Sequence, residues 1–482
     1  MYMWQKRKYL IISILANILL IGALSFSNTT ASIASNNLTI QKMAADPNLK
    51  GFWLSSKMPG VGRFDHTATL LLDGRVLVVG GLQDRTSQSL GLSSVEIFDP
   101  SSRTWNNTDS LNTGRSDHTA TLLENGQVLV AGGIDRYQGI ALASVEIYDP
   151  VSGSWAFAPS LSEPRYGHSA TLLPDGKVLI AGGRFSSESS DVLASVELYD
   201  PQTETWSATD SLNTPREGHS ATLLSNGRVL VVGGYYLGWL GTAEVYDPLS
   251  ENWQEIPDPI FCHGVAHTAT RLLDGRVLVV GGACAGGAIG ILREAEIYDP
   301  FSSSWEATTS LPTAREAHTA TLLPDGTVLI VGGDNGDVPR YSGALIYDPI
   351  DDNWMTTGSL SVGRRNHTAT LLRNGAVLIV GGWSDTEIAL DVTELYIDSI
   401  VDVSTPTNNL IQLTNTPIPT YIPASTQAPI GEPVLKPMIS NLSILMLITI
   451  TCLLTIVCIT AIIWWISKTI KPKKDDTSFQ NR

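Results

Sequence analysis

The chain has 482 residues and a formal net charge of −16, with 47 acidic and 31 basic side chains. This acidic balance excludes the classes of protein that bind nucleic acid through a basic surface. The chain is also longer than one ordinary domain, and 43% of its residues are hydrophobic, which is enough for a large core.

The N-terminal segment has the pattern of a secretory signal. Basic residues at positions 6–8 precede an apolar run from 9 to 26, and small residues follow as far as Ala34. Residues 1–34 are therefore predicted to be either a signal peptide cleaved after Ala34 or an uncleaved signal anchor.

One sequence unit then recurs seven times between residues 51 and 399. The first copy contains His66-Thr-Ala-Thr, the pair Asp73-Gly74, the pair Gly80-Gly81, the pair Asp99-Pro100 and then Trp105. The spacing of the repeat histidines, 48 to 52 residues, is typical of a propeller blade. These histidines are His66, His118, His168, His219, His267, His318 and His367.

Each part of the unit predicts a local structure. The short apolar runs around the Asp-Gly or Asn-Gly pair favour two strands joined by a type I′ turn. The Glu-Val/Ile-Tyr run before Asp-Pro favours a third strand, which proline ends, and the tryptophan marks a fourth. Seven four-stranded antiparallel sheets in a closed ring are therefore expected.

These motifs resemble those of the kelch-repeat β-propellers, an architecture also found in the central domain of galactose-oxidase-like enzymes. The resemblance covers residues 51–399, where Gly-Gly, Tyr-Asp-Pro and Trp recur together. It implies an all-β, seven-bladed kelch-type fold. It does not imply an activity, because function depends on sites built onto a fold.

The ends of the repeat region predict how the ring closes. The last copy reaches Tyr396 but has no Asp-Pro and no tryptophan after it, whereas Trp53 precedes the first histidine. Residues 51–57 are therefore predicted to form the outermost strand of the seventh sheet, which would remove two open sheet edges.

Two charged positions recur with the repeat. An arginine stands three residues before six of the histidines, and Gly264 replaces it in the fifth copy. The third strand carries a glutamate in six copies, with Ala344 taken as its replacement in the sixth. If the arginine of one copy paired with the glutamate of the next, as in Arg115 with Glu197, the two losses would fall in one pair.

The repeat also predicts two unlike faces. The uniform Asp/Asn-Gly and Asp-Pro turns share one face, here named the turn face. The segments before each first strand and after each Gly-Gly form the other, the variable face, where exposed aromatic and charged side chains could bind a sugar or a protein. The candidate binding residues are Phe64, Asp65, Asp117, Tyr166, Arg184, Glu217, Tyr235, Tyr236, Trp239, Glu316, Asp334, Arg365 and Trp383.

The fifth copy departs most from the pattern. Cys262 and Cys284 both fall on its variable face, where an extracellular location favours a disulfide between them. A metal site that includes His263 is the alternative. The repeat histidines are not expected to bind metal, because they recur by symmetry in different blades. No metal or other cofactor is therefore expected.

The C-terminal part predicts a membrane tether. Residues 403–437 are rich in proline and polar residues and suit an extended stalk. Residues 442–466 are almost entirely apolar and long enough for a transmembrane helix. The basic tail, 467–482, is expected in the cytoplasm, which places the propeller outside the cell.

Two functions follow from this organisation. The first is a monomeric surface propeller that binds a protein or glycan and acts in adhesion, with no enzyme activity. The alternative is an extracellular carbohydrate-active or galactose-oxidase-like enzyme that uses the variable face. No nucleophile elbow, phosphate loop or zinc motif is present in the sequence, and the tyrosine and histidine ligands of the copper enzymes have no matching set.

Overall fold

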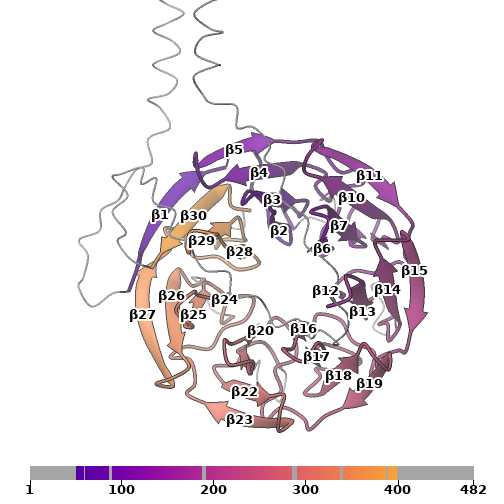
Figure 1. The fold of residues 1–482 in the computed structure, drawn as a ribbon. Helices are drawn as coiled ribbons and strands as arrows, with labels where there is room; N and C mark the ends of the chain where they lie inside the picture. The colour runs from indigo at the N-terminus through magenta and orange to yellow at the C-terminus, as the bar shows by residue number, and fades with distance from the viewer. Residues whose placement is uncertain are drawn as a thin grey trace, which may run out of the picture. The chain divides into compact units, whose positions relative to one another are not determined.

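The computed structural model describes residues 50–398, apart from residue 59 and the segments 86–89, 187–190, 285–289, 337–339 and 387–388. Seven four-stranded antiparallel sheets surround a central channel (Figure 1). The innermost strands contact their neighbours in an unbroken circle that includes the contact between the seventh blade and the first. The predicted all-β, seven-bladed propeller is therefore confirmed.

The strands are given by blade, from the innermost strand outward. Blade 1 has β2 (Thr67–Leu70), β3 (Val76–Val79), β4 (Val95–Asp99) and β5 (Thr104–Asn107). Blade 2 has β6 (Thr119–Leu122), β7 (Val128–Ala131), β10 (Val145–Asp149) and β11 (Ser154–Ala158), with a ribbon of β8 (Ile134–Asp135) and β9 (Ile140–Ala141). Blade 3 has β12 (Ser169–Leu172), β13 (Val178–Ala181), β14 (Val196–Asp200) and β15 (Thr205–Thr209). Blade 4 has β16 (Ser220–Leu223), β17 (Val229–Val232), β18 (Ala243–Asp247) and β19 (Asn252–Glu255).

The remaining three blades follow the same order. Blade 5 has β20 (Thr268–Arg271), β21 (Val277–Val280), β22 (Ala295–Asp299) and β23 (Ser304–Thr308). Blade 6 has β24 (Thr319–Leu322), β25 (Val328–Val331), β26 (Gly343–Asp348) and β27 (Asn353–Ser359). Blade 7 has β28 (Thr368–Leu371), β29 (Val377–Val380), β30 (Val392–Ile397) and β1 (Phe52–Lys57).

The core lies between neighbouring sheets. The second strand of every blade is buried along its whole length, as expected for an apolar strand covered on both faces. The repeat tryptophan packs at a tilt against the aromatic ring opposite it, as Trp155 does against Tyr148 at 5.0 Å between ring centroids. In six blades its indole N–H donates to a carbonyl of the preceding blade, which for Trp155 is Asp109 O at 2.9 Å. The repeated aromatic pair therefore joins adjacent blades.

The hairpin turns differ from the type I′ turn that the sequence favoured. Gly74 has a φ of 90°, but Asp73 is not among the described residues with positive φ. The Gly74 N–H donates to Leu71 O at 3.0 Å, which makes a four-residue turn from Leu71 to Gly74. This geometry is a type I turn followed by a left-handed glycine, in which only the glycine needs positive φ.

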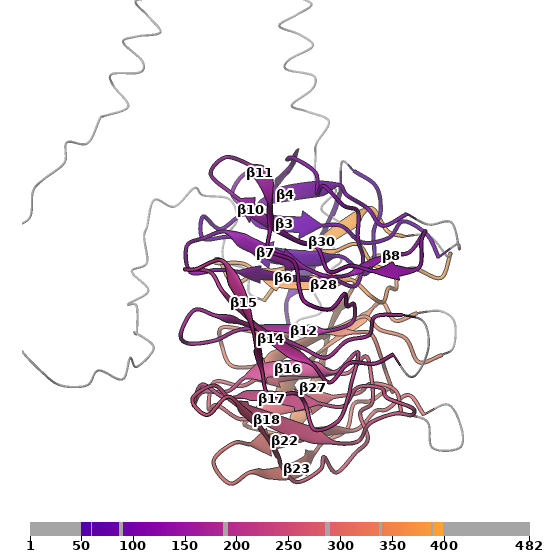
Figure 2. The same ribbon diagram turned by 90° about the vertical axis from the view of Figure 1, so that its right-hand side faces the viewer.

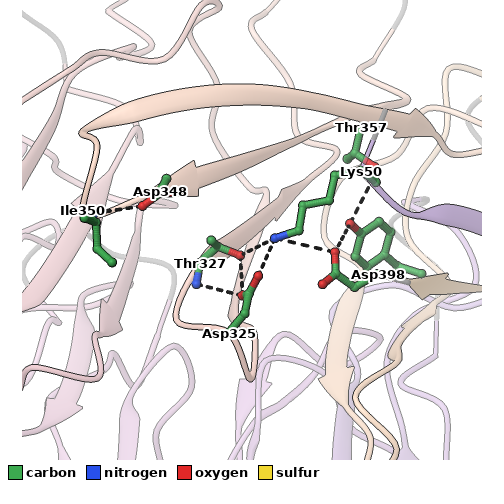
Figure 3. Close-up of polar contacts among 8 residues, drawn as sticks. Lys50, Asp325, Thr327, Asp348, Ile350, Thr357 and Asp398 are labelled. Atoms are coloured by element: carbon green, nitrogen blue, oxygen red, sulfur yellow. Dashed lines mark hydrogen bonds and ion pairs between the residues drawn. The ribbon is translucent and has the colours of Figure 1, made fainter. Parts of the chain in front are cut away.

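The predicted ring closure is confirmed. Strand β1 pairs antiparallel with β30, and Trp53 stands opposite Tyr396. Lys50 anchors the start of β1, because its Nζ lies 2.5 Å from Asp325 Oδ2 in blade 6 and 3.7 Å from Asp398 Oδ1 (Figure 3). Its carbonyl accepts a hydrogen bond from Thr357 Oγ1. The two ends of the ring therefore hold each other.

Several predictions concern segments that lie outside the described residues. They are the leader at 1–34, the stalk at 403–437, the transmembrane helix at 442–466 and the tail at 467–482. Within the part of the chain that the structure describes, no helix is long and apolar enough to cross a membrane.

Candidate binding face

The variable face is built as the antiparallel strand order requires. The segment before each innermost strand pairs with the segment after the Gly-Gly of the same blade, for example Tyr166 with Arg184 and Glu217 with Tyr235. The ribbon of β8 and β9 belongs to the same group of segments and extends from one side of the ring in the side view (Figure 2). The candidate residues are thus gathered on one face.

A collar of backbone hydrogen bonds surrounds the channel at this face. The residue before each repeat histidine has a φ between 50° and 62°, which is the left-handed region. Six of these residues donate their N–H to the carbonyl of the corresponding residue in the preceding blade, as Asp117 does to Asp65 at 3.3 Å. The collar residues are Asp65, Asp117, Gly167, Gly218, Ala266, Ala317 and Asn366.

The seven repeat histidines form a second circle below the collar. Each Nε2 makes a hydrogen bond with a Ser or Thr hydroxyl of the preceding blade, as His118 does with Thr67 at 2.9 Å. Burial lowers the pKa of His118, and the nearby Arg115 charge lowers it further, to about 3. The rings are therefore neutral, and their role is to join blades, as the sequence suggested.

The buried arginine and glutamate pair within one blade, so the predicted pairing between copies is wrong. Arg115 Nη2 lies 2.6 Å from Glu146 Oε1, and Glu197 pairs instead with Arg165 of its own blade at 2.8 Å. The arginine also donates to the first glycine of the Gly-Gly pair, as Arg115 Nη1 does to Gly132 O at 2.8 Å. Both bonds hold the segment entering the blade against the strands of that blade.

The replacement of the glutamate in blade 6 is also corrected. In β26 Ala344 stands opposite Val331 and Leu345 stands opposite Ile330. The register of β22 places Glu296 opposite Val279, one residue further from the Gly-Gly pair than Val280. Leu345, and not Ala344, therefore occupies the glutamate position. Its arginine, Arg315, lies instead 5.0 Å from the centre of the Tyr341 ring.

His263 takes the place of the arginine in blade 5. Its Nδ1 lies 2.7 Å from Gly281 O and its Nε2 lies 2.8 Å from Glu296 Oε1, the same two kinds of partner that the arginines have. Both atoms face hydrogen-bond acceptors in a fully buried position. His263 is therefore a structural residue. Cys262 and Cys284 form a disulfide beside it.

Two carboxylates meet at the rim of the channel. Asp65 accepts a hydrogen bond from Asn366 Nδ2 at 2.6 Å, and Arg136 Nη2 lies 3.0 Å from Asp117 Oδ2. Burial raises the pKa of Asp65, and the charge of Asp117 raises it further, to about 7. The carboxyl group of Asp65 therefore changes its charge near neutral pH.

The other charged candidates form ion pairs across the same face. Arg184 Nη2 lies 2.8 Å from Glu217 Oε1, which joins blade 3 to blade 4. Arg365 Nη1 lies 3.0 Å from Asp334 Oδ2 and 3.7 Å from Glu316 Oε1, which joins blade 7 to blade 6. These side chains are already paired, so a ligand would meet a preorganised set of charges.

Three arginines on this face were missed by the sequence analysis. Arg136 contacts Asp117, and Arg340 Nη1 lies 3.0 Å from Asp385 Oδ1. Burial lowers the pKa of the third arginine, Arg85, and the charge of Arg365 lowers it further, while the charge of Asp65 raises it. All three lie in segments after a Gly-Gly pair, but those segments vary in length, so no repeat spacing identifies them.

Two aromatic candidates are buried, which corrects the expectation that their rings are exposed. Phe64 and Trp383 pack at 4.7 Å between centroids, in a cluster with Leu82 and Ala389. The guanidinium carbon of Arg85 lies 5.3 Å from the centre of each ring and covers them. The two rings therefore support the position of Arg85 and are not free to stack on a ligand.

The loop of blade 4 keeps its apolar side chains exposed. Leu237 is 66% exposed and has a φ of 53°, a conformation that non-glycine residues rarely adopt. Trp239 lies beside it, in edge contact with Tyr235 at 5.5 Å. Other apolar side chains are exposed in the corresponding segments of blades 1, 2 and 3, and Ile260 is exposed in the segment that enters blade 5. This set, here named the apolar arc, consists of Leu90, Tyr137, Ile140, Phe185, Leu237, Trp239 and Ile260.

Comparison with known proteins identifies the repeat. Residues 65–282 match the KLHDC2/KLHL20/DRC7 Kelch-repeats domain. The chain is 36% identical over 76 residues to the F-box/kelch-repeat protein At1g16250 of Arabidopsis thaliana, which is 15% of this chain and 20% of that protein. It is 38% identical over 69 residues to Kelch-like protein 7 of Rattus norvegicus, which is 14% of this chain and 12% of that protein. The matches thus span a fifth or less of these curated relatives.

A solved structure shares the fold. A fungal alcohol oxidase of the AA5 family, solved in complex with copper, superposes with a TM-score of 0.57 at 17% identity, over 72% of this chain and 76% of that one. At this identity the likeness concerns the fold alone.

The histidine and cysteine side chains that the structure describes do not suit a copper site. All eight histidines make hydrogen bonds within the fold, and Cys262 is joined to Cys284. The residues that the structure describes contain no group of three or more His, Cys, Asp or Glu side chains placed to hold a metal ion.

Proposed function

This protein is a kelch-repeat β-propeller, and we propose that it binds a protein ligand on its variable face while the propeller is displayed outside the cell on the C-terminal stalk. Kelch propellers generally bind proteins, which supports the first part. The basic tail after the apolar run at 442–466 supports the second. The chain matches a fifth or less of the length of these curated relatives.

One observation carries the proposal. Apolar side chains exposed in blades 1 to 5 share the variable face with ion pairs between arginines and carboxylates, which lie in blade 2, between blades 3 and 4, and between blades 6 and 7. Protein interfaces combine apolar and aromatic anchors with arginine, and Trp239 and Arg85 are residues of these kinds. The collar of backbone hydrogen bonds holds these side chains on a rigid ring. Binding a ligand therefore loses little conformational entropy of the propeller.

The apolar arc favours a protein over a glycan as the ligand. Sugars bind to exposed aromatic faces bordered by hydrogen-bonding groups, but two of the aromatic candidates, Phe64 and Trp383, are buried. Leu237 and Ile260 are aliphatic and offer no stacking surface. Glycan binding is therefore the outcome that the test must separate from protein binding.

The test compares variants of the two faces. Residues 50–398 contain the whole closed ring, and this fragment would be used to capture proteins from a detergent extract of cell surfaces and to probe a glycan array. The variant Leu237→Ser with Trp239→Ala should lose the captured protein. A control on the turn face, Val151→Ser with Leu249→Ser, should keep it. Binding to glycans alone, or loss only in the turn-face control, would contradict the proposal.

A further inference from the structure

The turn face carries large apolar side chains at the tips of its Asp-Pro turns. Val151, Leu249, Phe301 and Ile350 are respectively 95%, 98%, 79% and 90% exposed. Each is the second residue after the turn aspartate, in blades 2, 4, 5 and 6. Single exposed apolar residues are common on protein surfaces, but a set that repeats at one structural position is unusual.

The turn geometry directs these side chains outward. The aspartate side chain folds back and accepts the N–H of the tip residue, at 2.9 Å for Val151, 3.0 Å for Leu249, 2.8 Å for Phe301 and 2.9 Å for Ile350. Figure 3 shows this bond between Asp348 and Ile350. Each carboxylate is therefore used within its turn, and the apolar side chain is left at the tip.

The other two Asp-Pro turns have polar tips in the same conformation. Ser101 and Gln202 occupy the tip position in these turns, and their N–H groups donate to the carboxylates of Asp99 and Asp200 at 2.8 Å. An apolar residue is thus not needed to form the turn. The four apolar tips do not contribute to the fold, because their side chains contact mainly solvent.

The two ends of the ring, Lys50 and Asp398, both lie at the turn face. Phe52 pairs with Ile397, so the first strand starts where the last one ends. Lys50 reaches Asp325 of an Asp-Gly turn, which places that end at the turn face (Figure 3). The apolar run at 442–466 begins ~40 residues beyond Asp398, a reach of on the order of 100 Å for an extended proline-rich chain.

We infer that the turn face docks on the surface of a zwitterionic lipid bilayer, with the four apolar tips entering the interfacial layer. The cellular setting of this docking rests on the proposed display by the C-terminal segment. A tether holds the propeller at a high effective concentration near the membrane, so a weak intrinsic affinity is sufficient. Docking would turn the variable face away from the membrane, toward ligands.

The charge of the turn face selects the lipid. Each Asp-Pro turn carries an aspartate, and Glu204, Glu251, Asp351 and Asp352 add further carboxylates in these turns. The carboxylates of the Asp-Gly turns are balanced, because Asp73, Asp175, Asp274 and Asp325 form ion pairs with Arg75, Lys177, Arg276 and Lys50. Anionic headgroups would be repelled by these charges, whereas apolar insertion into phosphatidylcholine meets no such repulsion. Anionic lipid is therefore expected to weaken docking, and added salt to restore it.

The experiment measures co-sedimentation of the 50–398 fragment with phosphatidylcholine vesicles, because this fragment contains all seven blades and the closure strand. We expect measurable binding, a decrease of about tenfold in the partition coefficient for Phe301→Ser and for Leu249→Ser, and weaker binding to vesicles that contain phosphatidylserine. The matched changes Ser101→Ala and Gln202→Ala should have no effect, and Ser101→Leu should strengthen binding.

Two results would overturn the inference. One is equal sedimentation of the wild-type fragment with and without vesicles. The other is concentration-dependent self-association that Phe301→Ser and Leu249→Ser abolish, which would assign the tips to a contact between two copies. Neither result bears on ligand capture by the variable face, which is measured without lipid, so the failure of this inference and of the proposed function can be told apart.

Discussion

Arg115 and Glu146 form an ion pair of 2.6 Å in which both side chains are completely buried. The glutamate also accepts the Asn112 N–H at 2.7 Å, so the pair fixes the segment that enters blade 2. Five blades have such an arginine–glutamate pair, and in the fifth blade His263 contacts the glutamate instead. In these six blades the contact is a clamp inside the blade, and it positions the variable face above it.

A double-mutant cycle should show this pairing directly. Arg115→Met and Glu146→Leu should each lower the free energy of unfolding by about 3–5 kcal/mol, because each leaves a buried charge without its partner. The double variant should lose much less than the sum of the two. Arg115→Met with Glu197→Leu should instead be additive, because these residues belong to different pairs. Urea unfolding of the 50–398 fragment gives all four values, and a non-additive result for the second combination would contradict the pairing.

Removal of the buried arginine should lower the free energy of unfolding least in blade 6. Arg315 has no carboxylate in ion-pair contact among the described residues, and burial lowers its pKa to about 10. Arg315→Met therefore leaves no unpaired carboxylate and loses mainly the contact with Tyr341 and the bond to Gly332 O. We expect Arg315→Met to lower the free energy of unfolding by about 2 kcal/mol less than Arg115→Met does. Equal losses in urea unfolding would show that the carboxylate is not the source of the cost.

The histidine circle should make the propeller sensitive to acid. The folded-state pKa of His118, His168, His267 and His367 is about 3, far below the unfolded value near 6.5. The unfolded chain therefore binds more protons between about pH 6.5 and pH 3, and stability falls as the pH falls through this window.

At pH 5 each of these histidines should lower the free energy of unfolding by about 2 kcal/mol. Urea midpoints measured from pH 7 to pH 5 should fall steeply for the wild type and less steeply for His118→Gln. A variant curve parallel to that of the wild type would show that His118 is protonated in the folded state as well.

The collar predicts a stabilising substitution. Ala317 has a φ of 50°, which costs an L-residue about 1–2 kcal/mol. Ala317→Gly should raise the free energy of unfolding by about 0.5–1 kcal/mol, after the entropy that glycine adds to the unfolded chain. The reciprocal change Gly167→Ala should lower it by a similar amount, since a Cβ there would be at least 3.7 Å from its neighbours and only φ is strained. Thermal unfolding of both variants provides the check, and destabilisation by Ala317→Gly would refute it.

Sequence alone determined the blade count, the antiparallel order within each blade and the closing strand. These follow from local rules that act within one repeat, namely turn residues, short apolar strands and the displaced Trp53. The division into a turn face and a variable face followed in the same way. Sequence spacing did not identify the residue at the glutamate position of blade 6, or the residue that replaces the arginine in blade 5. Leu345 and His263 each lie one residue away from the position that the repeat spacing predicts.

Only the tertiary structure decided which side chains meet and which remain exposed. The spacing of a repeat is the same whether Arg115 reaches Glu146 in its own blade or Glu197 in the next, so the choice depends on the reach of the side chain across the folded sheet. Phe64 and Trp383 are buried because two loops from neighbouring blades pack together, and Phe301 is exposed because its turn directs it away from the ring. Such contacts join residues from different repeats, and local sequence rules carry no information about them.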